Sequence, residues 1–165
     1  MKIRLLVLLL AAAPLCPALT VKRLPDGVLL DFGTYREKVA VYADDIIRVT
    51  ASPEADAAVR PSLDALPASR PQPSWEWQEG PAGGVLRTGR IEVRVDARDG
   101  RLSFLDASGV PILAEKPGVE KLTPAVVQGE TTFHVRAAWE PHADEAFFGL
   151  GQNQFGLVDL KGHDL

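Results

Sequence analysis

Cysteine, clustered basic residues and long apolar runs are all scarce in this sequence. Its 165 residues include one cysteine, which excludes a scaffold held together by disulfides. Lysine and arginine number 18 against 22 aspartate and glutamate, with no basic cluster, so we expect no nucleic-acid partner. With 46% hydrophobic and 24% charged residues, the chain has the composition of one folded domain.

One apolar run stands at the N-terminus. Met1–Arg4 carries two positive charges, Leu5–Ala13 is unbroken and apolar, and prolines follow. This order is typical of a secretory signal peptide, and the run is shorter than the roughly 20 residues that a membrane span needs. We expect residues 1–18 to be a signal peptide cleaved after Ala18. The protein would then be exported to the periplasm or the extracellular space, with no membrane contact after cleavage.

A lipoprotein signal is the alternative at this end of the chain. It would use Cys16 as the first mature residue, but the bulky Leu15 before it fits such a signal poorly. Cleavage after Ala18 would remove 18 of the 165 residues, Cys16 among them, and leave 147. The mature chain, residues 19–165, is therefore predicted to be one domain stabilised by packing alone.

Hydrophobic residues alternate with polar ones through most of the mature chain. Ile91, Val93 and Val95 alternate with charged residues, and so does the segment Phe133–Trp139, which predicts strands with one buried face. Further strands are expected at Val28–Phe32, Lys38–Tyr42, Ile46–Thr50, Arg101–Leu105 and Val110–Leu113. Pro25-Asp26-Gly27, Asp99-Gly100 and Ser108-Gly109 are expected to form the turns between them. The sequence therefore predicts an all-β fold, an antiparallel sandwich or barrel.

Residues 51–73 interrupt this pattern with five prolines among alanines. Proline lacks the backbone donor that a central strand needs, so we expect a surface excursion within the domain. A short helix near Glu54–Leu66 is the other option for this segment.

Most motifs that could carry chemistry fail on inspection. Gly149-Leu150-Gly151 lacks the third glycine of a dinucleotide-binding loop, and no serine stands in a Gly-x-Ser-x-Gly elbow. His134, His142 and His163 lie on separate segments without the spacing of a zinc site. We therefore expect no metal and no cofactor, while the many Asp and Glu residues leave open whether two carboxylates meet, since sequence alone does not place them face to face.

The segment Trp75-Glu76-Trp77 leaves two interpretations open. Alternation puts both indoles on one side of a strand, where they could form a platform for a sugar ring. Such pairs more often pack in a core.

The segment Glu145–Gly156, followed by Leu157–Gly162, resembles the end of the N-terminal domain of glycoside hydrolase family 31, the α-glucosidase and α-xylosidase family. In that family an aromatic-Gly-Leu-Gly-Glu/Gln run precedes a Leu-x-Gly. The paired strands around Val39–Tyr42 and Ile46–Val49, and the strand-turn-strand from Ile91 to Leu113, agree with it in order. Gln152 replaces the glutamate of many members and resembles the xylosidase type.

The resemblance implies a galactose-mutarotase-like β-sandwich that packs on a (β/α)8 barrel holding the catalytic carboxylates. The chain would then be the first part of an exported α-xylosidase or α-glucosidase, ending before the barrel and inactive by itself. Its partners would be the barrel and, through the whole enzyme, an α-linked oligosaccharide or xyloglucan-type glycan. Gln152, Asn153 and Phe155 would face the barrel or the carbohydrate. The alternative is a stand-alone exported sandwich that binds carbohydrate or protein without catalysis.

Overall fold

The computed structural model describes residues 19–54, 56, 60, 73–149 and 156–162. Its regular elements in these ranges are antiparallel β-strands. Within the same ranges, no helix is long and apolar enough to span a membrane. The predicted signal peptide, and most of the proline-rich segment 51–73 with its optional helix, lie outside the described residues.

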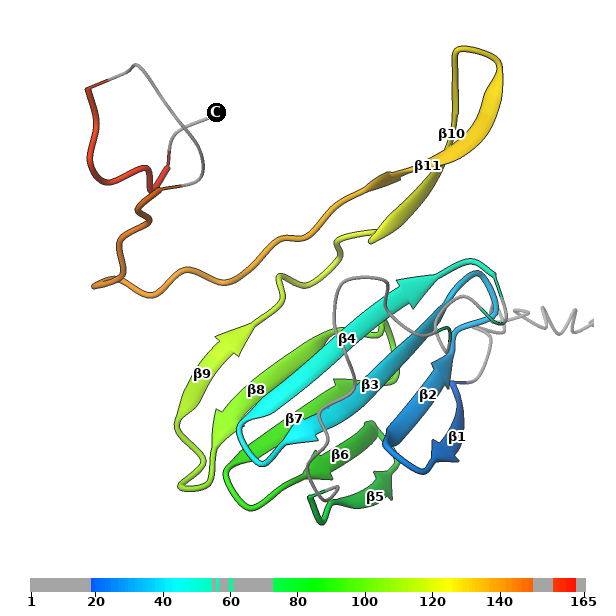
Figure 1. The fold of residues 1–165 in the computed structure, drawn as a ribbon, viewed down its shortest axis with the longest axis vertical. Helices are drawn as coiled ribbons and strands as arrows, with labels where there is room; N and C mark the ends of the chain where they lie inside the picture. Colours follow the sequence, from blue (N-terminus) through cyan, green and yellow to red (C-terminus); the bar gives the residue numbers. More distant parts are fainter. Residues whose placement is uncertain (1–18, 55, 57–59, 61–72, 150–155, 163–165) are drawn as a thin grey trace, which may run out of the picture.

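The strands form two larger sheets in which each strand pairs with the next one along the chain (Figure 1). The first sheet contains β1 (Thr20–Leu24), β2 (Gly27–Asp31), β3 (Arg36–Ala43) and β4 (Ile46–Ser52). The second contains β5 (Glu76–Gly80), β6 (Gly83–Arg87), β7 (Ile91–Asp96), β8 (Leu102–Asp106) and β9 (Pro111–Ala114). A separate hairpin consists of β10 (Leu122–Val127) and β11 (Glu130–Val135).

The hydrophobic core lies between the two larger sheets, which stack face to face in Figure 1. Its fully buried aliphatic side chains come from both layers: Val28, Leu30, Val39, Leu86, Val93 and Leu102. Alternate residues of β2, β3 and β7 supply pairs of core side chains, as the period of two predicts. The chain is therefore an all-β antiparallel sandwich, and that prediction is confirmed.

In each of the two larger sheets, one glycine lets two consecutive strands approach each other closely. Gly27 opens β2 with a φ of 151°, and Gly83 opens β6 with a φ of 135°. A Cβ atom would lie 2.0 Å from the carbonyl oxygen of Val39 at the first position and 1.9 Å from that of Val95 at the second. A side chain at either position would push the next strand away. The chain turns at Pro25 and Asp26 between β1 and β2, so the turn predicted at Pro25-Asp26-Gly27 is confirmed.

The β10–β11 hairpin extends away from the sandwich (Figure 1). We expected Phe133–Trp139 to be a strand with a buried face, and this is wrong in two respects. The strand ends at Val135, and Val135 itself is 78% exposed. Beyond it, Trp139 makes only an isolated bridge to Glu115. Among the described residues no third strand pairs with β10 or β11, and most side chains of the two strands are exposed.

Candidate functional site

Three of the residues that the sequence singles out cannot be placed. Gln152, Asn153 and Phe155 lie outside the described residues, and their position toward a barrel or a carbohydrate stays a prediction.

The tryptophan pair lies on the inner side of β5 and of the segment before it. Trp77 is 5% exposed and belongs to the core cluster, and Trp75 packs against that cluster with its Nε1 donating to the carbonyl of Pro25 at 3.3 Å. The Trp77 indole covers Gly84, where an added Cβ would lie 2.0 Å from the ring. These contacts agree with the interpretation in which the two tryptophans pack against the core. Sugar stacking on this pair stays a prediction that the burial of Trp77 does not favour.

The register of four strands creates a row of side chains on the outer face of the second sheet. Gln78 pairs with Val85, Val85 with Arg94, and Arg94 with Ser103. The neighbours of Val85, Arg94 and Ser103 along their strands are buried in the core, so this row faces away from it.

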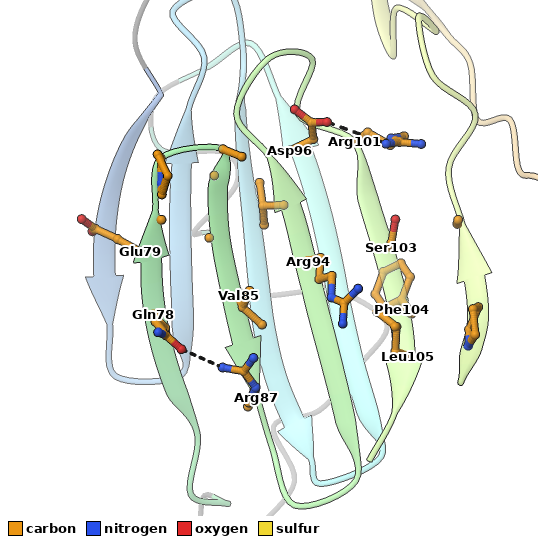
Figure 2. Close-up of a pocket in the computed structure, with 18 of the residues that line it drawn as sticks. Gln78, Glu79, Val85, Arg87, Arg94, Asp96, Arg101, Ser103, Phe104 and Leu105 are labelled. Atoms are coloured by element: carbon orange, nitrogen blue, oxygen red, sulfur yellow. Dashed lines mark hydrogen bonds and ion pairs between the residues drawn. The ribbon is translucent and has the colours of Figure 1, made fainter. Parts of the chain in front are cut away.

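The row lines a hollow of about 710 Å³ on that outer face (Figure 2). Val85, Leu105 and Leu113 give it an apolar floor, and Arg87 and Arg94 stand among them. Its volume is within the range of small-ligand sites. We name this hollow the outer-face groove.

A shared carboxylate fixes the two arginines of the outer-face groove. The Glu92 carboxylate contacts Arg87 Nε at 2.8 Å and Arg94 Nε at 2.6 Å, and Arg87 also donates to Gln78 Oε1 at 3.0 Å. Burial by itself would raise the pKa of Glu92, but the hydrogen bonds from Arg94 and Arg87 outweigh it and hold that pKa below its usual value. Glu92 is therefore ionised at neutral pH and holds both guanidinium groups in place.

A second group of charges stands at one end of the outer-face groove. Asp96 contacts Arg98 at 2.8 Å and Arg101 at 3.7 Å. Hydrogen bonds from the Arg98 side chain and backbone lower the pKa of Asp96 to about 2. The Nε of Arg101 is buried and has no hydrogen-bond partner among the described residues.

Sequence patterning could not find the outer-face groove. The alternation in Ile91–Asp96 places Glu92, Arg94 and Asp96 on a polar face, which is most simply a solvated one. Only the pairing of β5, β6 and β7 brings Gln78, Arg87 and Arg94 together, and the register between strands is not readable from the pattern of one strand.

A buried ion cluster joins the sheets to the hairpin. Lys121 Nζ lies 2.7 Å from Glu37 on β3, 2.9 Å from Glu115 just after β9, and 3.3 Å from the carbonyl oxygen of Gly100. Glu37 is fully buried, and its Oε1 has no hydrogen-bond partner among the described residues. Burial raises the pKa of Glu37, while the charge and hydrogen bond of Lys121 oppose that rise.

The ion cluster has little room for a substrate. The space lined by Glu115 and Lys121 has a volume of about 10 Å³, which holds about one water molecule. A neighbouring hollow of about 250 Å³ is lined by Tyr35 and Lys121, and burial followed by the charges of Glu37 and Glu115 raises the pKa of Tyr35 above its usual value. Glu37 lines neither of these two spaces, and its buried carboxylate is paired with Lys121, which indicates a structural role for the ion cluster.

Exposed apolar side chains gather on the hairpin and the chain that follows it. Eight of the twelve large hydrophobic side chains that are exposed within the described ranges lie beyond residue 125. They are Val126, Val127, Val135, Trp139, Phe147, Phe148, Leu157 and Val158. We name this set the apolar extension. Its residues lie along the hairpin and the stretch of chain that follows it outside the sandwich (Figure 1).

No metal site emerges from the part of the chain that the structure describes, since it holds no group of three or more His, Cys, Asp or Glu side chains placed to share an ion. His163 lies outside that part.

Comparisons with known proteins agree with this architecture. Residues 37–165 match the family model described as the glycosyl hydrolase 31 N-terminal galactose mutarotase-like domain. A GH31 α-xylosidase from Xanthomonas citri superposes with a TM-score of 0.73 at 32% identity, over 87% of this chain and 16% of that one. A GH31 α-xylosidase from a soil metagenome, solved with xylose, superposes with a TM-score of 0.68 at 22% identity, over 87% of this chain and 24% of that one.

The chain thus spans less than a quarter of the length of either solved structure. The two sheets with a core between them form a β-sandwich, and the family model that matches residues 37–165 indicates the same kind of domain. The chain belongs to the family of N-terminal galactose mutarotase-like domains of glycosyl hydrolase 31.

Proposed function

We propose that this chain is the N-terminal domain of an exported family 31 α-glycosidase that hydrolyses O-glycosidic bonds and prefers α-xylosyl over α-glucosyl linkages. The observation that carries the proposal is the 32% identity, over 87% of this chain, to an α-xylosidase of which the matched region is only 16%. Hydrolysis would belong to the remaining polypeptide of such an enzyme, and this domain would supply part of its architecture.

The carboxylates of this chain support that division. Retaining glycosidases need two carboxyl groups about 5–5.5 Å apart, on either side of a sugar. Glu37 and Glu115 both contact the Lys121 ammonium group, and the space that Glu115 lines holds about one water molecule. Glu92 is held between two arginines, so its charge is already neutralised by neighbours. We therefore expect no turnover from the 165-residue chain.

The apolar extension supports contact with further polypeptide. A two-stranded hairpin is marginally stable in water, and β10–β11 carries Val126 and Val135 at 72% and 78% exposure. The barrel of a longer enzyme would cover these side chains. A glycan of the α-linked oligosaccharide or xyloglucan type would reach the domain through that enzyme, and the export signal expected at residues 1–18 would bring it to the periplasm or outside the cell.

The test is to express the complete reading frame of the gene and measure hydrolysis of an aryl α-xyloside and an aryl α-glucoside. We expect both substrates to be cleaved by the long protein, with the larger kcat/KM for the xyloside, and neither by the 165-residue chain. Cleavage by the 165-residue chain itself would contradict the proposal that hydrolysis belongs to the remaining polypeptide. A long protein that cleaves neither substrate would contradict the proposed activity and favour a non-catalytic binding module.

A further inference from the structure

The outer-face groove offers many more hydrogen-bond donors than acceptors. Arg94 uses Nε on Glu92, so its two terminal amino groups have no partner among the described residues. Arg87 uses Nε and Nη1, which leaves Nη2, and Gln78 uses only its Oε1, which leaves its NH₂ group. The Ser103 hydroxyl also points from this row without a partner within the described ranges. The side-chain acceptors that line the groove are Gln78 Oε1, Ser103 and the carboxylates Glu79 and Asp96, of which Gln78 Oε1 and Asp96 are occupied by arginines.

Charge gives the groove the same preference. Arg87, Arg94 and Arg101 line it, and Arg98 contacts its end, against the carboxylates Glu79, Glu92 and Asp96. One positive charge is in excess there, although the whole chain has a net charge of −4. The hydroxyl groups of a neutral sugar both donate and accept hydrogen bonds, whereas an ionised carboxylate only accepts and carries a negative charge. The groove therefore matches a carboxylate better than a neutral hydroxyl group.

The floor of the groove limits what carries that carboxylate. Val85, Leu105 and Leu113 line the groove beside the two arginines, and Figure 2 shows Arg94 between Val85 and Leu105. Such aliphatic side chains pack against the apolar face of a pyranose ring, and about 710 Å³ is more than a single carboxylate ion would fill. We infer that the outer-face groove binds an oligosaccharide bearing a uronic acid, with Arg94 and Arg87 holding its carboxylate and the aliphatic floor packing against its ring. The sugar part rests on the proposed function, and the carboxylate part rests on the groove alone.

The test is calorimetric titration of the full 165-residue chain with two probes that differ only in the acid. These are xylotriose substituted with one glucuronic acid and unsubstituted xylotriose. We expect saturable binding of the acidic probe, at least ~10-fold tighter than that of the neutral one, because charge-assisted hydrogen bonds are about twice as strong as neutral ones. A third titration with acetate separates a sugar site from a plain anion site.

Arg94→Gln should weaken binding of the acidic probe by at least ~10-fold, and Arg87→Gln serves as a second, independent variant. Arg90→Gln is the matched control, because Arg90 is an exposed arginine paired with Asp45 and does not line the groove. Its affinity should stay within about twofold of the unchanged chain, as expected for an exposed charge away from the site.

Equal affinity for the two trisaccharides, or equal effects of Arg94→Gln, Arg87→Gln and Arg90→Gln, would overturn the inference. Acetate binding as tightly as the acidic trisaccharide would overturn its sugar part. These outcomes are separate from the proposed function, since hydrolysis by the longer enzyme could succeed while the groove fails to bind, or the reverse.

Discussion

The Trp77 ring occupies the space that a side chain at position 84 would fill, so Trp77 requires glycine at that position. The indole lies over Gly84, which is on the adjacent strand two positions from the residue that pairs with Trp77. Such diagonal neighbours are within reach of an aromatic side chain on the same sheet face. The absence of a side chain at Gly84 is therefore what lets Trp77 reach 5% exposure.

Gly84→Ala should lower the free energy of unfolding by about 1–3 kcal/mol, because the new methyl group would overlap the indole and force the packing apart. Urea denaturation followed by tryptophan fluorescence measures this. Gly89→Ala is the control, since the nearest atom to its added Cβ would be 3.7 Å away, and we expect it to change stability by less than about 0.5 kcal/mol. Equal stabilities of the two variants would contradict the packing account.

The sequence placed both tryptophans on one side of a strand, which the structure bears out in position. It could not say that Gly84 receives the Trp77 ring, because that depends on the register between β5 and β6. The same limit hid the outer-face groove, whose arginines come from different strands. Patterns along one strand predict faces, and pairing between strands decides which residues meet.

At the scale of elements, the ion cluster connects three segments that are distant along the chain. Lys121 precedes β10, Glu37 lies in β3 of the first sheet, and Glu115 follows β9 of the second. The cluster therefore fixes the base of the β10–β11 hairpin to both layers. Together with backbone hydrogen bonds between residues 114–116 and 138–140, it holds the base of the hairpin against the sandwich.

Lys121→Met should lower the free energy of unfolding by about 3 kcal/mol at pH 8, because the fully buried Glu37 carboxylate would lose its cation. The loss should be smaller at pH 5. Burial already raises the pKa of Glu37 above 4.5, and without Lys121 that pKa rises further. A folded-state pKa above the unfolded one makes the folded state bind protons more tightly, so lowering the pH toward 4.5 restores stability.

Urea denaturation at both pH values measures these differences, with Lys116→Met as the control. Lys116 is exposed and has no ion pair within the described part of the chain, so its replacement should change stability by less than about 0.5 kcal/mol. A Lys121→Met effect that is independent of pH, or no larger than that of Lys116→Met, would contradict the proposed anchoring.

Sequence patterning identified the strands of the sandwich better than those of the hairpin. The runs predicted at Lys38–Tyr42 and Ile46–Thr50 lie within β3 and β4, because their alternate residues face a real core. β10 was not predicted, since it contains Pro124, and β11 lacks the buried face that its alternation indicated. Proline is tolerated on a strand that has one partner, and the alternation of β11 faces no covering layer among the described residues.

At the scale of the whole molecule, the chain divides into a packed sandwich and the apolar extension. The buried aliphatic side chains lie between the two larger sheets, while eight exposed hydrophobic ones lie beyond residue 125. The matched region is 16–24% of the two solved α-xylosidases. A domain that joins a larger polypeptide at its apolar extension, as we propose, would account for all three observations.

The most direct test of that account is the intact mass and N-terminal sequence of the mature protein recovered from its natural host. The account predicts a polypeptide several times heavier than 17.8 kDa, beginning near Leu19 after removal of the signal peptide. A 17.8 kDa polypeptide that begins at Met1 would contradict both the export and the larger enzyme.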